Sequence, residues 1–274
     1  MNYRHAFHAG NHGDCLKHAL LVWLLAAMQR KPGGVFVLDS HAGVGRYDLG
    51  DGPAARTGEA QRGILRLLAD PPAALAAYVA LAERLGLYPG SPWIVRALLR
   101  EQDRLACCEL HPEDFAALRR LFARDAQVAA HQRDAWEAIG ALLPPKTGEK
   151  RALVLIDPPY EAVDEFERLA AGLALAHRRM QGAVLAAWYP IKHRAPVRAF
   201  HTALRESGVR DIVAAELFLR APLDPARLNG SGLLVVNPPF GFEAAAQPML
   251  AALLDRLGEG EEGQGWDVLR IVDE

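Results

Sequence analysis

Hydrophobic and polar positions along this chain follow two periods that alternate. Residues 11–30 carry apolar side chains at helical spacing, which predicts an amphipathic helix that ends at the Pro-Gly-Gly of residues 32–34. Residues 34–39 form a short apolar run without that spacing, which predicts a buried strand. The alternation resumes after residue 93. The pattern there predicts helices near 93–101, 112–124, 134–143, 163–179, 194–207 and 243–257, and strands near 104–109, 127–130, 151–156, 182–188, 210–219, 233–237 and 268–272. We expect the strands near 210–219 and 233–237 to pair as a hairpin.

Strands that alternate with helices predict a mostly parallel sheet with helices on both faces, and therefore an α/β fold. Residues 50–96 interrupt the alternation, because they hold glycine and proline breaks and two helices near 59–69 and 72–86. We interpret them as an inserted helical subdomain. The main domain then comprises residues 1–49 and 97–274.

The composition narrows the class of protein. The chain has 274 residues, with 31 Lys and Arg against 33 Asp and Glu, so contacts with a nucleic acid would have to come from local basic patches. Three cysteines exclude a disulfide framework, and the adjacent Cys107 and Cys108 are expected as buried thiols on opposite faces of a strand. The N-terminus lacks a secretory apolar segment, and the longest apolar run, residues 19–28, is too short to cross a membrane. We therefore expect a cytoplasmic protein.

The candidate chemistry lies at the ends of the predicted strands. In open α/β sheets, ligands bind beyond the carboxyl ends of the strands. Residues 39–45 hold a glycine turn, in which His41 and Gly43 would allow a ligand to approach the backbone. Asp48 stands where a dinucleotide fingerprint needs a third glycine, so the turn favours a less charged adenosine ligand such as S-adenosylmethionine. A plain structural turn is the alternative.

Two acidic residues follow the next two strands. Glu109 is placed to accept hydrogen bonds from ribose hydroxyls, and Asp134 could accept from an adenine amino group. Either acid alone is commonly a solvated charge or a helix cap, and Asp134 directly precedes a predicted helix. Together with the glycine turn, the two acids outline an adenosine site.

The tetrapeptide from Asp157 to Tyr160 is the most informative motif. Its two prolines hold Asp157 and Pro158 extended and remove two N–H donors, so the segment presents acceptors, the Asp157 carboxylate and the Pro158 carbonyl. Two acceptors suit an exocyclic amino group, whose N–H bonds they would orient so that the lone pair faces a sulfonium methyl group. The ring of Tyr160 offers a face on which a base could stack after leaving its helix. The alternative is a loop that ends a strand at prolines.

The N-terminal residues are rich in side chains that could reach over such a site. Four histidines lie within the first 18 residues, but no acid completes a clear ligand set, so we predict polar contacts and no metal. Lys17 and His18 lie on the first predicted helix. Tyr3 and His5 precede that helix and are expected to reach over the site.

Seven segments of the chain together resemble one family. They are TyrArgHisAlaPheHisAlaGlyAsnHis with LysHis (3–18), AspSerHisAlaGlyValGlyArgTyr (39–47), TyrProGlySerPro (88–92), GluLeuHisPro (109–112), AspProProTyrGlu (157–161), AlaTrpTyrPro (187–190) and AsnProProPhe (237–240). The family is that of the RlmJ-type 23S ribosomal RNA adenine-N6 methyltransferases, and the resemblance covers nearly the whole chain. Departures are slight: Ser40 stands where Thr is common, and Cys15 where an aliphatic residue is usual.

The resemblance implies a class I, Rossmann-like methyltransferase fold with a small helical subdomain inserted after the glycine motif. It implies methylation of the N6 amine of a flipped-out adenine in 23S ribosomal RNA, before full ribosome assembly, by a monomer that needs neither metal nor membrane. Asp157 would be the catalytic acceptor. A substrate-side lid would comprise Tyr3, His5 and Lys17. The residues implied to contact S-adenosylmethionine are His18, His41, Ser91, Glu109, Asp134, Ala135 and Asp157, beside Gly43 in the glycine turn.

A second motif of the amine-binding type, AsnProProPhe at residues 237–240, competes with residues 157–160. Position favours 157–160, which follow the fourth strand after the glycine motif, and we expect 237–240 to pack or to shape the substrate pocket. Two other classes stay open: a methyltransferase that acts on DNA adenine or on a protein glutamine amide, and a non-catalytic module that binds S-adenosylmethionine and RNA. Basic residues that could contact RNA, or simply form solvated helix faces, are Arg46, Arg56, Arg62, Arg66, Lys192, His193, Arg194 and Arg198.

Overall fold

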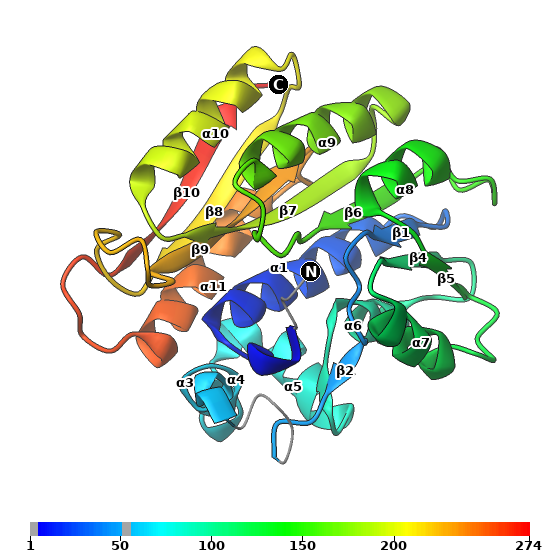
Figure 1. The fold of residues 1–274 in the computed structure, drawn as a ribbon. Coiled ribbons are helices and arrows are strands. Elements are labelled where there is room, and N and C mark those ends of the chain that lie inside the picture. Colours follow the sequence, from blue (N-terminus) through cyan, green and yellow to red (C-terminus); the bar gives the residue numbers. More distant parts are fainter. Residues whose placement is uncertain (1–4, 51–55) are drawn as a thin grey trace.

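The computed structural model describes residues 5–50 and 56–274. Eight strands of the described chain form the central sheet: β1 (Phe36–Asp39), β4 (Arg104–Glu109), β5 (Val128–Gln132), β6 (Ala152–Ile156), β7 (Val184–Ile191), β8 (Ile212–Phe218), β9 (Gly230–Val236) and β10 (Gly265–Val272). Their order across the sheet is β10-β8-β9-β7-β6-β1-β4-β5 (Figure 1). Strands β5, β4, β1, β6 and β7 run parallel, whereas β9 is antiparallel to both β7 and β8, and β10 is antiparallel to β8.

The predicted α/β class and the predicted hairpin are confirmed, with one addition. Strands β8 and β9 pair antiparallel, with Ile212 opposite Val236. Strand β9 also pairs with β7, so the hairpin is built into the sheet rather than added at its edge. The last strand begins at Gly265, earlier than its apolar pattern indicates, because its polar first residues continue the ladder as far as Phe218.

Helices cover both faces of the sheet, as the alternation predicts (Figure 1). One face packs against α8 (Ala135–Leu142), α9 (Glu165–Arg179) and α10 (Arg194–Glu206). The other packs against α1 (His12–Gln29), α6 (Ser91–Leu98), α7 (Pro112–Leu121) and α11 (Phe242–Leu257). Cys107 and Cys108 belong to the cores on opposite faces and are free, buried thiols, as predicted. In the described part of the chain, no helix has the length and apolar character needed to cross a membrane.

The predicted insertion contains short helices that pack against α1 and α11. They are α3 (Glu59–Arg62), α4 (Ile64–Ala69), the 3-10 turn η2 (Ala73–Leu75) and α5 (Ala76–Arg84). The single helix expected over residues 59–69 is wrong, because the chain breaks at Gly63. A Cβ atom at Gly63 would lie 1.9 Å from the carbonyl oxygen of Gly10, and the next residue, Ile64, donates its N–H to that same oxygen at 2.8 Å. The two segments therefore touch backbone to backbone.

The ends of the predicted insertion lie side by side. Strand β2 (Arg46–Tyr47) pairs antiparallel with β3 (Tyr88–Pro89) in a two-stranded ribbon. The chain therefore leaves the main sheet and returns to it at one place. The boundaries at residues 50 and 96 stay a prediction.

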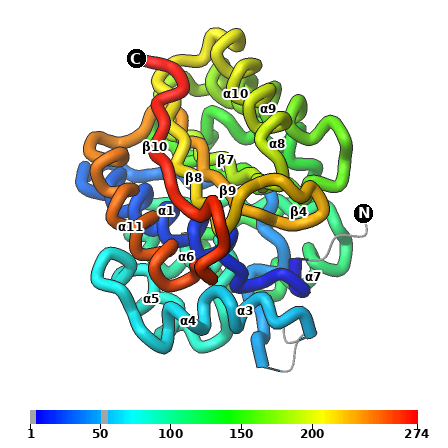
Figure 2. The backbone as a smooth tube through the Cα atoms, turned by 90° about the vertical axis from the view of Figure 1, so that its left-hand side faces the viewer, coloured from blue at the N-terminus to red at the C-terminus, as the bar shows by residue number. Residues whose placement is uncertain are grey.

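The segment before α1, which contains the 3-10 turn η1 (His5–Phe7), lies beside α3 (Figure 2). Thr57 donates its hydroxyl to the carbonyl oxygen of Phe7 at 2.8 Å. Nδ1 of His8 lies 2.8 Å from one carboxylate oxygen of Glu59, and Asn11 donates to the other at 3.0 Å. The N-terminal segment is thus held between the insertion and the main domain.

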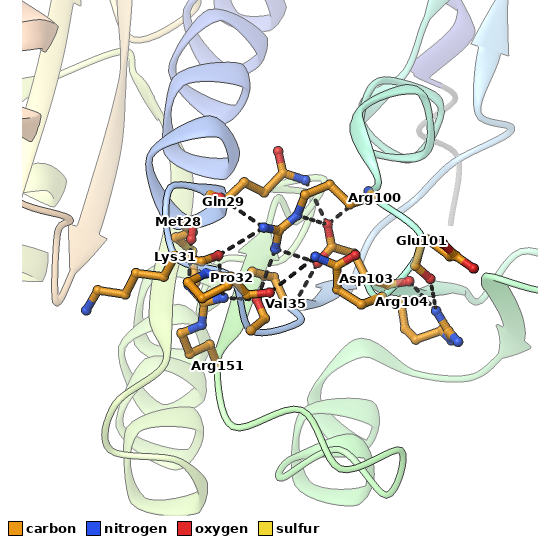
Figure 3. Close-up of polar contacts among 12 residues, drawn as sticks. Met28, Gln29, Lys31, Pro32, Val35, Arg100, Glu101, Asp103, Arg104 and Arg151 are labelled. Carbon is orange, nitrogen blue, oxygen red and sulfur yellow. Dashed lines mark hydrogen bonds and ion pairs between the residues drawn. The ribbon is translucent and has the colours of Figure 1, made fainter.

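A cluster of hydrogen bonds closes the amino-terminal edge of the sheet (Figure 3). Asp103 has no exposed surface and accepts from the backbone N–H of Val35 and from Nη2 of Arg100, both at 2.9 Å. Arg100 also donates to the carbonyl oxygens of Gln29 and Lys31, both at 2.9 Å. These charge-assisted bonds join the end of α1 to the starts of β1 and β4.

Candidate active site

A cavity of about 990 Å³ opens at the carboxyl edge of the parallel strands. Twelve of the residues that the sequence singles out line it: His5, Lys17, His18, His41, Gly43, Ser91, Glu109, Asp134, Ala135, Asp157, Pro158 and Tyr160. Tyr3 lies outside the described residues. The convergence expected from strand-end positions is therefore present in the fold.

The glycine turn after β1 and the acid after β4 are joined directly. Gly43 has a φ of 58°, and its N–H donates to Oε2 of Glu109 at 3.0 Å. The N–H of His111 donates to Oε1 of the same carboxylate at 2.7 Å. Burial raises the pKa of Glu109. Each carboxylate oxygen has a further lone pair, so Glu109 is held in place and can still accept from the hydroxyls of a ligand.

Asp134 is the cap of helix α8, the alternative that its position already suggested. Its Oδ1 accepts from the N–H of Trp136 at 2.9 Å and from the N–H of Glu137 at 3.2 Å. Both bonds use the same oxygen, so Oδ2 can accept from a ligand in the cavity. Ala135 follows at the first position of the helix and also lines the cavity. Capping and ligand binding are therefore compatible here.

The loop after β6 is fixed at both ends. The N–H of Asp157 donates to Nδ1 of His41 at 3.3 Å. Tyr160 has a φ of 52°, which is uncommon for an aromatic residue, and donates its hydroxyl to the carbonyl oxygen of Trp188 at 2.8 Å. The Tyr160 ring lies 5.8 Å from that of Trp188, edge to face. Burial raises the pKa of Tyr160 well above its usual value, so the phenol stays a neutral donor.

Lys17 contacts the candidate catalytic carboxylate directly. Its Nζ lies 2.5 Å from Oδ2 of Asp157 and 2.9 Å from Oδ1 of Asp14. Lys17 is buried, and burial alone would lower its pKa, but the two carboxylates outweigh that effect and raise it. The ammonium is therefore permanently charged. The sequence placed Lys17 on a substrate-side lid and gave no signal of this ion pair with Asp157.

Of the two histidines expected at the cofactor, His18 is buried and His41 partly buried, and both are neutral. Burial lowers the pKa of His18 to about 3 and that of His41 to about 4. Nδ1 of His18 lies 2.9 Å from the hydroxyl of Tyr88, whereas Nε2 is a buried atom without a hydrogen-bond partner among the described residues. Ser91 begins α6 and lines the same cavity. These groups can hydrogen bond to a ligand without adding charge.

Asp39 belongs to the strand-end segment that the sequence singles out, residues 39–45, but the sequence assigned no role to it. It ends β1, has no exposed surface, and burial raises its pKa to about 6. Its place at a strand end was visible in the sequence. Only the fold shows that no solvent reaches it.

The second motif, residues 237–240, does not shape the cavity, and that part of its interpretation is wrong. Because β9 is antiparallel to β7, Asn237 lies at the amino-terminal edge of the sheet, where it donates to the carbonyl oxygens of Gln181 and Ala183, both at 2.7 Å. None of the four residues lines the cavity. Asn237 joins the end of β9 to the segment before β7, whereas Phe240 is 98% exposed and does not pack.

The basic residues considered for RNA contact divide into three groups: those that line the cavity, those that are paired within the protein, and those that are exposed elsewhere. Arg62 and Lys192 line the cavity. Arg66 pairs with Glu259 at 3.2 Å, and Arg194 pairs with the buried Glu216 at 3.3 Å and lies over the ring of Phe218. The remaining candidates, Arg46, Arg56, His193 and Arg198, are exposed. Sequence analysis missed Arg220 and Arg227, which line the cavity and bind Glu261.

The N-terminal histidines make polar contacts. Nε2 of His5 lies 3.0 Å from Oδ2 of Asp14, and His8 contacts Glu59. Over residues 5–50 and 56–274, no three His, Cys, Asp or Glu side chains gather in a way that could hold a metal ion.

A mostly parallel sheet, in which β9 and the edge strand β10 are antiparallel to the other strands, and a cavity at its carboxyl edge are features of a class I S-adenosylmethionine-dependent methyltransferase. Residues 32–271 match the model of the family described as Ribosomal RNA large subunit methyltransferase D, RlmJ, and the chain belongs to this family. The fold class expected from the sequence is confirmed.

Curated relatives and one solved structure agree with this assignment. The chain is 38% identical to Ribosomal RNA large subunit methyltransferase J of Escherichia coli K12, over 98% of this chain and 99% of that protein. It is also 38% identical to the protein of the same name from Haemophilus influenzae, over 100% of both chains. The crystal structure of LPL1258 from Legionella pneumophila is similar with a TM-score of 0.87 and 31% identity, over 96% of this chain and 98% of that one.

Proposed function

We propose that this protein transfers the methyl group of S-adenosylmethionine to the exocyclic N6 amine of an adenine in 23S ribosomal RNA. One observation carries the proposal: the Asp157–Pro158 loop and the Gly43–Glu109 contact line the same cavity. An amine acceptor and an adenosine site within one cavity are what methyl transfer to a base requires. The ribosomal RNA methyltransferase relatives support RNA as the substrate.

The residues present fit S-adenosylmethionine, which supplies an electrophilic sulfonium methyl group when bound. Gly43 lines the cavity and has a positive φ, and a Cβ atom there would lie 2.5 Å from the Tyr47 hydroxyl, so this turn requires a glycine. Glu109 would accept from the ribose hydroxyls, and Asp134 from the adenine amino group. Neutral His18 and His41 would hydrogen bond without repelling a cationic ligand.

Asp157 and Pro158 would act on the target amine. The lone pair of an aromatic amine is delocalised into the ring, which makes the amine a poor nucleophile. A carboxylate oxygen of Asp157 and the Pro158 carbonyl would each accept one N–H bond and orient the lone pair out of the ring plane. The carboxylate would also stabilise the positive charge that develops on nitrogen as the bond forms. After methyl transfer rather than before it, the methylated nitrogen would lose one proton to water.

The base would have to leave its stack to reach this loop. The ring of Tyr160 is held by its hydroxyl and by the neighbouring ring of Trp188, so it offers a fixed face for stacking. Segment 5–10 would lie over the base from the opposite side, and Lys17 on α1 would stay paired with Asp157 beneath it. We propose that the substrate is 23S RNA before full ribosome assembly, and that the protein acts as a cytoplasmic monomer.

Mapping of N6-methyladenine in 23S RNA tests the proposal. Cells that lack the protein would be complemented with the wild-type gene, with Asp157→Ala, or with Asn237→Ala as the matched motif control. We expect one methylated adenine with the wild type and with Asn237→Ala, and none with Asp157→Ala, because only Asp157 lines the cavity. The reverse pattern would move the catalytic role to residues 237–240.

A methyl-transfer assay with the purified protein distinguishes RNA, DNA and protein as substrates. Labelled S-adenosylmethionine would be offered with protein-free 23S RNA, with adenine-containing DNA and with a mixture of ribosomal proteins. Label in RNA alone is the expected result. Label in DNA or protein would favour the other methyltransferase classes, and no transfer to any of them would leave a binding module.

A further inference from the structure

Asp14 is a buried carboxylate to which the chemistry above gives no role. It lies in the first turn of α1 and is 2% exposed. Its oxygens serve two different parts of the molecule. Oδ2 accepts from the N–H of Gly10 at 2.9 Å and lies 3.0 Å from Nε2 of His5, whereas Oδ1 lies 2.9 Å from Nζ of Lys17. One side chain thus joins the N-terminal segment to the cation that contacts Asp157.

Stabilisation of the helix does not explain this arrangement. The cap of α1 is Asn11, whose Oδ1 accepts from the N–H of Asp14 at 3.0 Å. The start of the helix is therefore capped without the Asp14 carboxylate. Burial alone would raise the pKa of Asp14, but His5 and Lys17 hold that pKa well below its usual range, so the side chain is an anion.

The charges of Asp14, Lys17 and Asp157 indicate a role for Asp14. Two carboxylates, Asp14 and Asp157, share the single ammonium of Lys17, which is 4% exposed. The sum of these three charges is negative. Without Asp14, Lys17 and Asp157 would form a neutral pair, and the ammonium would be free to bind both oxygens of Asp157. A neutral pair would stabilise positive charge on an amine less well, and an ammonium bound to both oxygens of Asp157 would leave no oxygen for that amine.

We infer that Asp14 is a positioning residue, which holds the Lys17 ammonium on Oδ2 of Asp157 so that Oδ1 remains available to the substrate amine and the ammonium is shared between two carboxylates. This inference rests on the proposed role of Asp157 as amine acceptor. Since Oδ2 of Asp14 binds the segment around His5 and Gly10, the same carboxylate also sets how that segment lies over the site.

A double-mutant cycle tests the inference. Asp14→Asn, Lys17→Gln and the double variant would be compared with wild type in single-turnover methyl transfer to protein-free 23S RNA. We expect Asp14→Asn to lower the rate about 100-fold, because the acceptor is misplaced. The affinity for S-adenosylmethionine, measured by calorimetry, should change by less than about twofold. The double variant should be no slower than Lys17→Gln alone, because Asp14 acts through Lys17.

Asp103→Asn is the matched control. Asp103 is also a fully buried carboxylate in an ion-pair cluster, but it lies at the amino-terminal edge of the sheet (Figure 3). This variant should lower the melting temperature and leave the single-turnover rate near that of the wild type. A loss of rate equal to that of Asp14→Asn would reduce Asp14 to a structural role.

Other outcomes overturn the inference separately from the proposed function. If the wild type is active and Asp14→Asn is equally active, the inference is refuted and the proposed function stands. The same holds if the effects of Asp14→Asn and Lys17→Gln are additive. A wild type that transfers no methyl group to RNA would refute both. A crystal structure of the wild type with S-adenosylhomocysteine and adenosine gives a second measurement that needs no variant: Nζ of Lys17 should lie within about 3.2 Å of both Asp14 and Asp157. A Lys17 that leaves Asp14 in that complex would also refute the inference.

Discussion

At the scale of single residues, neighbouring strands give two carboxylates opposite surroundings. Asp157 follows β6 and contacts the ammonium of Lys17, whereas Asp39 ends β1 and has no exposed surface. Strand-end positions in the sequence were enough to bring Glu109, Asp157 and the glycine turn to one site, and Lys17 was added to it only through the family resemblance. They could not show the ion pair, because its partners are 140 positions apart and meet only through the path of α1 across the sheet.

Asp39 makes stability depend on pH in a definite direction. Its pKa is about 6 in the folded protein against an ordinary value of 3.8. Below pH 3.8 both states hold the proton. As the pH rises to 6, the unfolded state ionises while the folded state keeps its proton, so stability falls, and above pH 6 the loss is complete. A shift of this size corresponds to about 3 kcal/mol.

We therefore expect Asp39→Asn to be more stable than the wild type near pH 7.5, by up to about 3 kcal/mol, and to lose that advantage near pH 4. Denaturant unfolding at several pH values measures the difference directly. A gap between the two proteins that does not change with pH would show that Asp39 titrates normally in the fold.

At the scale of elements, apolar periodicity predicted nearly every helix and strand, and its failures come from contacts that are distant in sequence. The pattern over residues 59–69 reads as one helix, but α3 and α4 are separated at Gly63 because the backbone of Gly10 passes there. Residues 265–267 look like loop and join β10 because β8 offers an open ladder. Local spacing carries no information about either neighbour.

Gly63→Ala should be strongly destabilising, by about 2 kcal/mol or more, because the added methyl group would overlap the Gly10 carbonyl. Gly182→Ala is the matched control, since a Cβ atom there meets nothing within 4 Å. Thermal unfolding of the two variants provides the comparison. Equal melting temperatures would mean that α3 and the N-terminal segment can separate at little cost.

At the scale of the whole molecule, the net charge of −2 gives no general attraction to RNA, so affinity has to come from cations near the cavity. Lys192 is exposed and lines the cavity. Arg194, its neighbour, is held by Glu216 and Phe218 within the protein. Reversing the charge of Arg194 would leave the buried Glu216 without its cationic partner and would destabilise the protein. A lower RNA affinity of that variant could then reflect lost stability, so Lys192 is the better residue to test.

Lys192→Glu should weaken binding to protein-free 23S RNA and lower the slope of log affinity against log salt by about 1. Lys150→Glu, in the exposed loop that precedes β6 at the other edge of the sheet, is the control and should leave both quantities unchanged. Filter binding over a range of salt concentrations measures them. Unchanged affinity of Lys192→Glu at low salt would remove this residue from the RNA surface.

The direction of β9 has a consequence for how such chains are searched. The parallel ladder of β6 ends with Ile156 opposite Ala187, and the antiparallel ladder of β9 ends with Val236 opposite Leu185, so the two similar tetrapeptides leave the sheet in opposite directions. A search for sequence motifs alone would find two methylation motifs in this protein, at residues 157–160 and 237–240. The direction of the strand that precedes each tetrapeptide therefore decides whether that tetrapeptide reaches the cavity, and only residues 157–160 follow a strand whose carboxyl end lies there.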